Sequence, residues 1–210
     1  MDCPVCRAPK PAAFTEVDGR AYWACENCQA RFLDAAQRPS PEAELARYRE
    51  HENDIDDPRY RAFLSKLADP LLARLAPGLS GLDYGCGPGP ALAAMMAEAG
   101  HRMTLYDPFF CPDEGALERE YDFIACSETA EHFHHPADEF DRLDRLLRPG
   151  GWLGLMTCFQ TDDDRFAEWH YRKDPTHVVF YREATMRVIA GMRDWTCEVP
   201  AKDVALMRKN

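Results

Sequence analysis

The chain has 210 residues, and its 36 acidic residues outnumber its 25 basic residues, which gives a net charge of −11 at pH 7. This length is enough for one full domain with a small appendage. The negative charge argues against tight non-specific binding of nucleic acid, because such a surface repels phosphates. No charged-then-apolar leader opens the chain and no apolar run is long enough to span a membrane, so we expect a cytoplasmic protein without a membrane partner.

Four of the nine cysteines form two C-x-x-C pairs near the start of the chain. Cys3 and Cys6 make the first pair, and Cys25 and Cys28 make the second, with 18 residues between the pairs. Four thiolates at this spacing are typical of a closed tetrahedral zinc site, which is structural because no coordination position stays open. Two disulfides or a redox-active dithiol are the alternatives.

The segment between the two cysteine pairs carries a hairpin signal. Asp18-Gly19 separates the segments 12–17 and 20–24, which alternate apolar and polar residues. An Asp-Gly pair in this position is typical of a tight two-residue turn between antiparallel strands. We therefore predict a zinc ribbon over residues 1–36, too small to fold without its metal.

A linker and a helical cap are predicted over residues 37–78. Ser40 and Pro41 are suited to cap and to begin a first helix, and a second helix is expected from Pro58 to Ala76 because its apolar residues recur at helical spacing. Its Tyr60 is expected either at the helix surface or facing a pocket, and the same alternatives hold for His51.

A glycine-rich turn at 85–89 is the most informative part of the sequence. The short apolar segment 79–84 precedes it and the Ala- and Met-rich segment 91–100 follows, which predicts a strand, a turn and a helix. Pro90 occupies the position where the dinucleotide fingerprint has its last glycine, and no G-K-[ST] of a phosphate loop is present. The turn exposes backbone N–H groups at a helix start, where a ligand binds.

Two acidic residues narrow the identity of that ligand. Asp83 lies beside the turn, where its charge disfavours a pyrophosphate, and Asp107 ends the next predicted strand, roughly 20 residues beyond the glycines. An aspartate there accepts hydrogen bonds from the hydroxyls of a ribose. A ribose without a pyrophosphate, combined with a charged amine, describes S-adenosylmethionine.

Four motifs together resemble the class I S-adenosylmethionine-dependent methyltransferases. They are Leu82-Asp83-Tyr84-Gly85-Cys86-Gly87-Pro88-Gly89, Tyr106-Asp107, the segment 121–128, and Leu147-Arg148-Pro149-Gly150-Gly151-Trp152-Leu153. The resemblance covers about residues 58–210. Its specificity comes from the order and spacing of the motifs, since the glycine turn alone is weak.

The resemblance implies an α/β fold over residues 79–210: a Rossmann-like, seven-stranded methyltransferase sheet with helices on both faces, preceded by the small four-cysteine zinc ribbon. Segments 195–200 and 204–209 are expected to form the antiparallel hairpin that ends this sheet. The stretch between Asp107 and Tyr121 is short for a third strand. The cofactor contacts that it implies are Asp83, Gly85, Cys86, Gly87, Gly89, Asp107, Pro108, Ser127 and Glu128.

The candidate chemistry begins after the strand at 121–127. Glu128, Glu131 and His132 follow an E-x-x-E-H pattern that shares one face of a helical turn. The pattern resembles the ubiquinone-biosynthesis O-methyltransferases and the small-RNA 2′-O-methyltransferases, in which it binds metal. A divalent cation, magnesium or manganese, is therefore one interpretation; the other is metal-free, with the first acid beside the cofactor. His177 is a base, a further metal ligand or a loop anchor.

The catalytic candidates are thus Glu131, His132 and His177. Arg172 and Lys173 either hold an anionic group of the substrate or belong to a solvated loop. We predict a methyltransferase that acts on a small molecule or another non-nucleic-acid acceptor, with O-, N- and C-methylation all open. One alternative is an RNA methyltransferase that uses the ribbon for recognition, although residues 1–35 hold only four basic residues against five acidic ones. The other is a non-catalytic, zinc-stabilised interaction protein with a degenerate methyltransferase fold.

Overall fold

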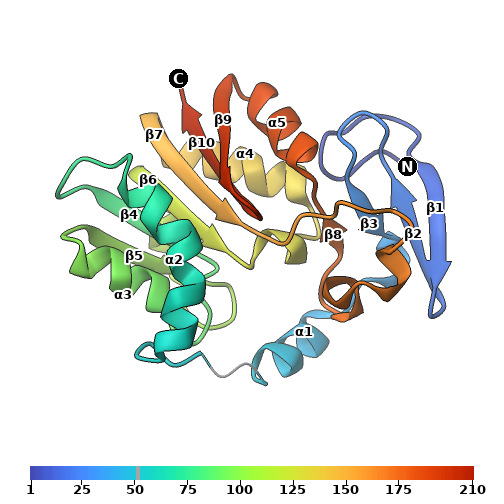
Figure 1. Cartoon of the computed structure of the whole chain (residues 1–210), viewed down its shortest axis with the longest axis horizontal. Coiled ribbons are helices and arrows are strands. Elements are labelled where there is room, and N and C mark those ends of the chain that lie inside the picture. The colour runs from blue at the N-terminus through green and yellow to red at the C-terminus, as the bar shows by residue number, and fades with distance from the viewer. Residues whose placement is uncertain (51–52) are drawn as a thin grey trace.

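The computed structural model describes residues 1–50 and 53–210, and it contains two β-sheets (Figure 1). The smaller sheet has the strand order β1-β2-β3-β8 and the larger has the order β5-β4-β6-β7-β10-β9. The strands are β1 Ala12–Val17, β2 Arg20–Ala24, β3 Arg31–Leu33, β4 Ser80–Tyr84, β5 Arg102–Tyr106, β6 Tyr121–Ser127, β7 Leu147–Met156, β8 Val179–Phe180, β9 Trp195–Ala201 and β10 Val204–Lys209. The α-helices are α1 Pro41–Tyr48, α2 Pro58–Leu72, α3 Ala91–Glu98, α4 Pro136–Leu146 and α5 Glu183–Gly191.

The smaller sheet is built on the predicted hairpin. Strands β1 and β2 pair antiparallel, and the two turn residues have left-handed backbone angles, with φ of 54° at Asp18 and 73° at Gly19. The hairpin prediction is therefore confirmed. Strand β3 pairs with β2, and β8 pairs with β3. Figure 1 shows the amino-terminal strands beside the segment around β8, so the sheet of the ribbon includes residues from outside 1–36.

The larger sheet has the Rossmann-like arrangement that the sequence predicts. Strands β5, β4, β6 and β7 run parallel, and the antiparallel hairpin of β9 and β10 completes the sheet against β7. Among the described residues this sheet has six strands, so the expected count of seven is not confirmed. Between Asp107 and Tyr121 the chain forms a bridge with Cys111 and a 3₁₀ turn at Glu114–Glu118. A crossover between parallel strands takes a dozen or more residues, so the segment 108–120 has the length for one crossover and not for a further strand with a second crossover.

Helices cover both faces of the larger sheet. Phe123 and Ile124 are neighbours in β6 and point to opposite faces, where each lies in a different hydrophobic cluster. Leucines of α2 and α3 pack in the cluster of Phe123, and α4 and α5 pack in the cluster of Ile124. The cluster of Ile124 also contains the four buried cysteines and Phe32 of the ribbon, so the ribbon and the larger sheet share a core.

The helical cap agrees with its prediction in outline. Helix α1 begins after Ser40, whose hydroxyl accepts the Ala43 N–H at 3.4 Å, and α2 ends four residues before the expected Ala76. His51 lies outside the described residues. Within the described ranges 1–50 and 53–210, no helix combines the length and the apolar character needed to cross a bilayer.

Candidate active site

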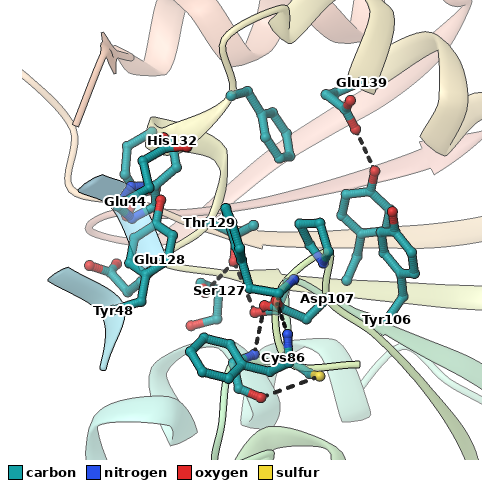
Figure 2. A pocket seen from close by; sticks show the side chains of 18 of the residues that line it. Glu44, Tyr48, Cys86, Tyr106, Asp107, Ser127, Glu128, Thr129, His132 and Glu139 are labelled. Atoms are coloured by element: carbon teal, nitrogen blue, oxygen red, sulfur yellow. Dashed lines mark hydrogen bonds and ion pairs between the residues drawn. The ribbon is translucent and has the colours of Figure 1, made fainter. Parts of the chain in front are cut away.

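A cavity of about 600 Å³ opens at the carboxyl ends of β4, β5 and β6 (Figure 2). Its wall includes the glycine turn, Asp107 and the residues after it, the segment 127–135 and two residues of α1. This is the edge at which open parallel sheets bind ligands, and the volume lies within the usual range of small-molecule sites.

Backbone geometry forms the glycine side of the cavity. Gly85 and Gly87 have φ of 80° and 62°, a region that disfavours side chains. A Cβ at Gly85 would lie 2.2 Å from the side chain of Thr129. The Gly85 N–H donates to the Tyr106 carbonyl at 2.8 Å, which ties the turn to β5. Gly85, Cys86 and Gly87 all line the cavity.

Asp107 organises the loop that faces the glycine turn. One oxygen of its carboxylate accepts the N–H groups of Phe109 and Phe110 at 2.8 and 3.0 Å, and the other accepts the Gly87 N–H at 3.0 Å. A carboxylate has about four acceptor positions, so one remains for a ligand. Pro108 lines the cavity beside it. Ser127 also lines the cavity, and its buried hydroxyl has no partner among the described residues.

Two expected cofactor residues do not line the cavity among the residues described. Asp83 is 3% exposed, and its carboxylate accepts the N–H of Ala93 in the first turn of α3 at 3.2 Å. Burial raises the pKa of Asp83 to about 7. Gly89 faces Asn53, whose carbonyl oxygen a Cβ would approach to 1.7 Å. Asp83 therefore supports the turn from the core, and Gly89 is the part of the turn that packs against Asn53.

The acceptor side of the cavity contains a buried polar cluster. Glu131 is fully buried, and one of its oxygens accepts the hydroxyl of Tyr171 at 2.5 Å while the other has no partner among the described residues. The same hydroxyl lies 3.2 Å from Glu128, whose backbone has a left-handed φ of 48°. The expected helical face is wrong in detail, because only residues 130–132 form a 3₁₀ turn and Glu128 precedes it.

The two histidines of this cluster both hydrogen-bond to a backbone carbonyl through Nδ1. His132 Nδ1 lies 3.0 Å from the Thr176 carbonyl, and His177 Nδ1 lies 2.7 Å from the Tyr171 carbonyl. A carbonyl only accepts, so Nδ1 carries the proton in both rings and Nε2 holds a free lone pair when the ring is neutral. Burial lowers the pKa of His177 to about 4, so His177 is neutral at pH 7.

The cavity is acidic overall. Among its described lining residues, six are acidic and one, Arg142, is an arginine. Arg142 donates to Glu139 at 2.9 Å and to the Tyr84 hydroxyl at 3.0 Å, so its charge is engaged within the wall. Burial, with the nearby Glu131, raises the pKa of Glu128 to about 9, so Glu128 is protonated at neutral pH. An anionic acceptor is disfavoured here.

A metal donor set is present, and it contains Glu131 and His132 of the expected pattern together with His177, the further ligand considered. Donor atoms of Glu131, His132 and His177 lie within 4.8 Å of one another, and Glu128 is not in this group. The unpartnered oxygen of Glu131 and the two free Nε2 atoms are suitable ligands. Two imidazoles and one carboxylate fit a divalent transition metal better than magnesium, which prefers oxygen ligands.

The four ribbon cysteines form a second donor set. The Sγ atoms of Cys3 and Cys28 are 3.7 Å apart, those of Cys6 and Cys25 are 3.5 Å apart, and all four lie within 4.8 Å of one another. Tetrahedral zinc with bonds of about 2.3 Å requires sulfur separations of about 3.8 Å. The cluster is compatible with structural zinc.

The structure also corrects and extends the list of candidate residues. Arg172 is buried and pairs with Asp18 of the ribbon, and the exposed Lys173 pairs with Glu168, so neither lines the cavity. Tyr60 does line it. Tyr171 directly precedes Arg172, and its link to Glu131 has no sequence signal. The cavity-lining residues that sequence reasoning did not single out include Glu44, Tyr48, Thr129, Glu139 and Arg142.

Comparison with known proteins identifies the family. A family model described as a methyltransferase domain matches residues 51–198. No curated protein matches the chain in sequence. Among solved structures, the 1,6-didemethyltoxoflavin-N1-methyltransferase of Burkholderia thailandensis, with bound 1,6-didemethyltoxoflavin and S-adenosylhomocysteine, aligns with a TM-score of 0.58 and 17% identity over 95% of this chain and 99% of that one.

Two further structures agree in fold. The magnesium protoporphyrin IX methyltransferase of Synechocystis PCC 6803, with bound S-adenosylhomocysteine, has a TM-score of 0.56 and 14% identity over 81% of this chain and 95% of that one. An S-adenosylmethionine-dependent methyltransferase of Aquifex aeolicus has a TM-score of 0.53 and 16% identity over 78% and 96% of the two chains. The chain therefore belongs to the methyltransferase-domain family and has the fold of S-adenosylmethionine-dependent methyltransferases.

Proposed function

We propose that the protein transfers the methyl group of S-adenosylmethionine to a small-molecule acceptor that is neutral or positively charged. One observation carries the proposal: a single cavity has the glycine turn and Asp107 on one side and the cluster of Glu131, His132 and His177 on the other. The similar toxoflavin and magnesium protoporphyrin methyltransferases act on small molecules, which supports this class of acceptor.

In this proposal the cofactor lies against the glycine turn. The backbone of Gly85, Cys86 and Gly87 faces its methionine end, the free acceptor position of Asp107 takes a ribose hydroxyl, and Pro108 packs nearby. The Ser127 hydroxyl and the protonated Glu128 supply further hydrogen bonds. Asp83 and Gly89 act indirectly by shaping the turn.

The acceptor enters from the side of α1. Its O, N or C nucleophile attacks the methyl carbon in line, the carbon–sulfur bond breaks, and the electron pair stays on sulfur, which leaves S-adenosylhomocysteine. The proton of the nucleophile passes to His177 Nε2, which carries a lone pair in the neutral ring, or to the oxygen of Glu131 that has no partner among the described residues. A divalent cation held by Glu131, His132 and His177 would lower the pKa of an acceptor hydroxyl.

The proposed domain division is a zinc ribbon at 1–36, a linker and helical cap at 37–78, and a methyltransferase domain at 79–210. Structural zinc stabilises the ribbon. The acidic cavity and the near-neutral charge of the ribbon both favour a small acceptor over RNA.

Calorimetry with S-adenosylmethionine tests the first half of the proposal. The zinc-loaded protein should bind it, and Asp107→Ala should weaken binding by at least about tenfold, because a charge-assisted hydrogen bond and the loop geometry are lost together. Asp113→Ala, which removes a similar cap at Gly115 away from the cavity, should bind normally. Absence of binding by the wild type would favour the non-catalytic interaction protein.

A transfer screen with methyl-labelled cofactor tests the second half. The label should appear in low-molecular-weight amines or hydroxyl compounds and not in RNA or protein. Salt-sensitive labelling of RNA would overturn the acceptor class in favour of the ribbon-guided alternative.

A further inference from the structure

Strand β8 joins the ribbon directly to the acceptor side of the cavity. Val178, which directly precedes β8, is fully buried, and its N–H donates to the carbonyl of Glu131 at 2.9 Å. The Val178 carbonyl accepts the N–H of Leu33 in β3 at 2.9 Å. One residue thus connects the ribbon sheet to the backbone of Glu131, and it directly follows His177 in the chain.

A second connection runs from the hairpin turn of the ribbon. The side chain of Asp18 is 73% exposed, and it accepts a hydrogen bond at 2.9 Å from Arg172, whose side chain is only 4% exposed. Arg172 directly follows Tyr171, which donates its hydroxyl to Glu131 and accepts the Nδ1 proton of His177 on its carbonyl. The hairpin turn therefore anchors Arg172, which is the chain neighbour of Tyr171.

Aromatic packing makes the junction rigid. Phe166 contacts Phe14 and Tyr22 of the ribbon and Phe180 of β8 edge to face, with ring centroids 5.0 to 5.2 Å apart. Phe166 itself is buried, so the ribbon meets the acceptor side through a packed core.

The cofactor side has no such link in the part of the chain that the structure describes. The glycine turn bonds to β5 and to the hydroxyl of Thr129, and Asp107 bonds to the turn and to its own loop. A displacement of the ribbon therefore reaches the cluster directly, through Val178 and Arg172, and the cofactor wall only indirectly, through Thr129.

We propose that the zinc ribbon is a positioning element of the acceptor site, in which Val178 and the ion pair between Asp18 and Arg172 hold Glu131, Tyr171 and His177 in their working geometry. This inference rests on the proposed function of the cavity. It assigns the ribbon a role inside the enzyme, and it makes Asp18 a positioning residue although it lies outside the cavity.

The test uses the zinc-loaded, full-length protein labelled with ¹⁵N-histidine, with the His177 and His101 signals assigned from His→Gln variants. Long-range ¹H–¹⁵N spectra report which ring nitrogen carries the proton. Asp18→Asn keeps a residue that tolerates the left-handed turn but removes the charge that holds Arg172. We expect the Nδ1 and Nε2 signals of His177 to shift or split while those of His101, buried against Phe123 on the opposite face, stay unchanged.

The matched control is Asp138→Asn, which removes an exposed ion pair between Arg7 of the ribbon and α4. It should leave the His177 signals unchanged. Both variants should bind S-adenosylmethionine within about twofold of wild type, as expected for sites without shared partners.

The outcomes separate the two proposals. Unchanged His177 signals in Asp18→Asn, with cofactor binding intact, would overturn the positioning role and leave the proposed function standing. Absence of cofactor binding in the wild type would overturn the proposed function, whatever the histidine spectra show. A shift of His177 and His101 together would indicate general destabilisation and would also count against the positioning role.

Discussion

The two sides of the cavity are built in different ways. The cofactor side consists mostly of backbone groups from two short stretches, the glycine turn and the loop of Asp107, each next to a parallel strand. The acceptor side gathers the side chains of Glu131, Tyr171 and His177, and Glu131 is held by Tyr171 and Val178, which lie 40 or more residues further along the chain. Cofactor geometry is therefore a local property, whereas acceptor geometry depends on the whole fold.

The two sides of the cavity also differ in what stabilises them. Backbone groups in a tight turn keep their geometry through dihedral preferences and need little support. Buried carboxylates and imidazoles must be held by partners, because an unpaired polar group in the core costs free energy. The acceptor side therefore depends more strongly on neighbouring elements than the cofactor side does, and variants should affect the two sides differently.

The largest expected effect is the loss of zinc. Cys28→Ser should lower the bound zinc below one per chain and reduce the melting temperature strongly, because structural zinc contributes about 10–16 kcal/mol of binding free energy. Metal analysis and thermal unfolding measure both quantities. Cys197→Ser, in β9 and outside the cluster, should retain full zinc and a normal melting temperature. Full zinc occupancy in Cys28→Ser would contradict the four-cysteine site.

A smaller effect is expected on the reaction itself. Glu131→Gln preserves the shape and the acceptor for the Tyr171 hydroxyl but removes a base, so methyl transfer should fall about 10²- to 10⁴-fold. Cofactor affinity should change far less than the rate, because Glu131 reaches the cofactor side only through the Tyr171 hydroxyl and Glu128. Turnover on an acceptor from the labelled screen, and calorimetry, provide the two readouts. The exposed Glu168→Gln is the control, and a loss of cofactor binding in Glu131→Gln would show that the two sides are not separable.

The cofactor side should show a pH dependence of stability through Asp83. Burial raises its pKa from an ordinary value of 3.8 to about 7, so the folded protein binds a proton more tightly than the unfolded chain does. The associated stability is present below about pH 4 and is lost as the pH rises to about 7, by up to about 4 kcal/mol. Asp83→Asn should therefore unfold at higher urea than wild type at about pH 8, with a smaller difference at about pH 5. Equal differences at both values would contradict the raised pKa.

The features that could be predicted from the sequence are also the local ones. The hairpin over 12–24, the glycine turn and the terminal hairpin of β9 and β10 depend on neighbouring residues, and all three form as expected. The third strand is absent from the described sheet because the segment after Asp107 is too short. The donor group contains His177 together with Glu131 and His132 of the expected E-x-x-E-H set, and it leaves out Glu128, where the backbone turns left-handed.

The pairing of β8 with β3 had no sequence signal. Val179 and Phe180 are a two-residue strand whose partner lies in the ribbon, and short apolar pairs occur throughout the chain. The same holds for Arg172. Its sequence context is consistent with a solvated loop or with a substrate contact, and only the tertiary structure shows that it pairs with Asp18. Long-range pairing of this kind depends on the complete chain, so residue patterns within one segment do not reveal it.

The smallest expected effect concerns the outer contact of the ribbon. Arg7 pairs with Asp138 and Asp141 of α4 at 2.8 and 2.7 Å, and these side chains are 38–70% exposed. Exposed ion pairs contribute about 0–1 kcal/mol and weaken in salt. Arg7→Ala should therefore lower the free energy of unfolding by at most about 1 kcal/mol, and the difference should shrink at high ionic strength. A larger, salt-independent loss would mean that this surface contact attaches the ribbon to the rest of the protein. The expected small loss would mean that the ribbon is attached through the buried junction of Val178, Phe166 and Arg172.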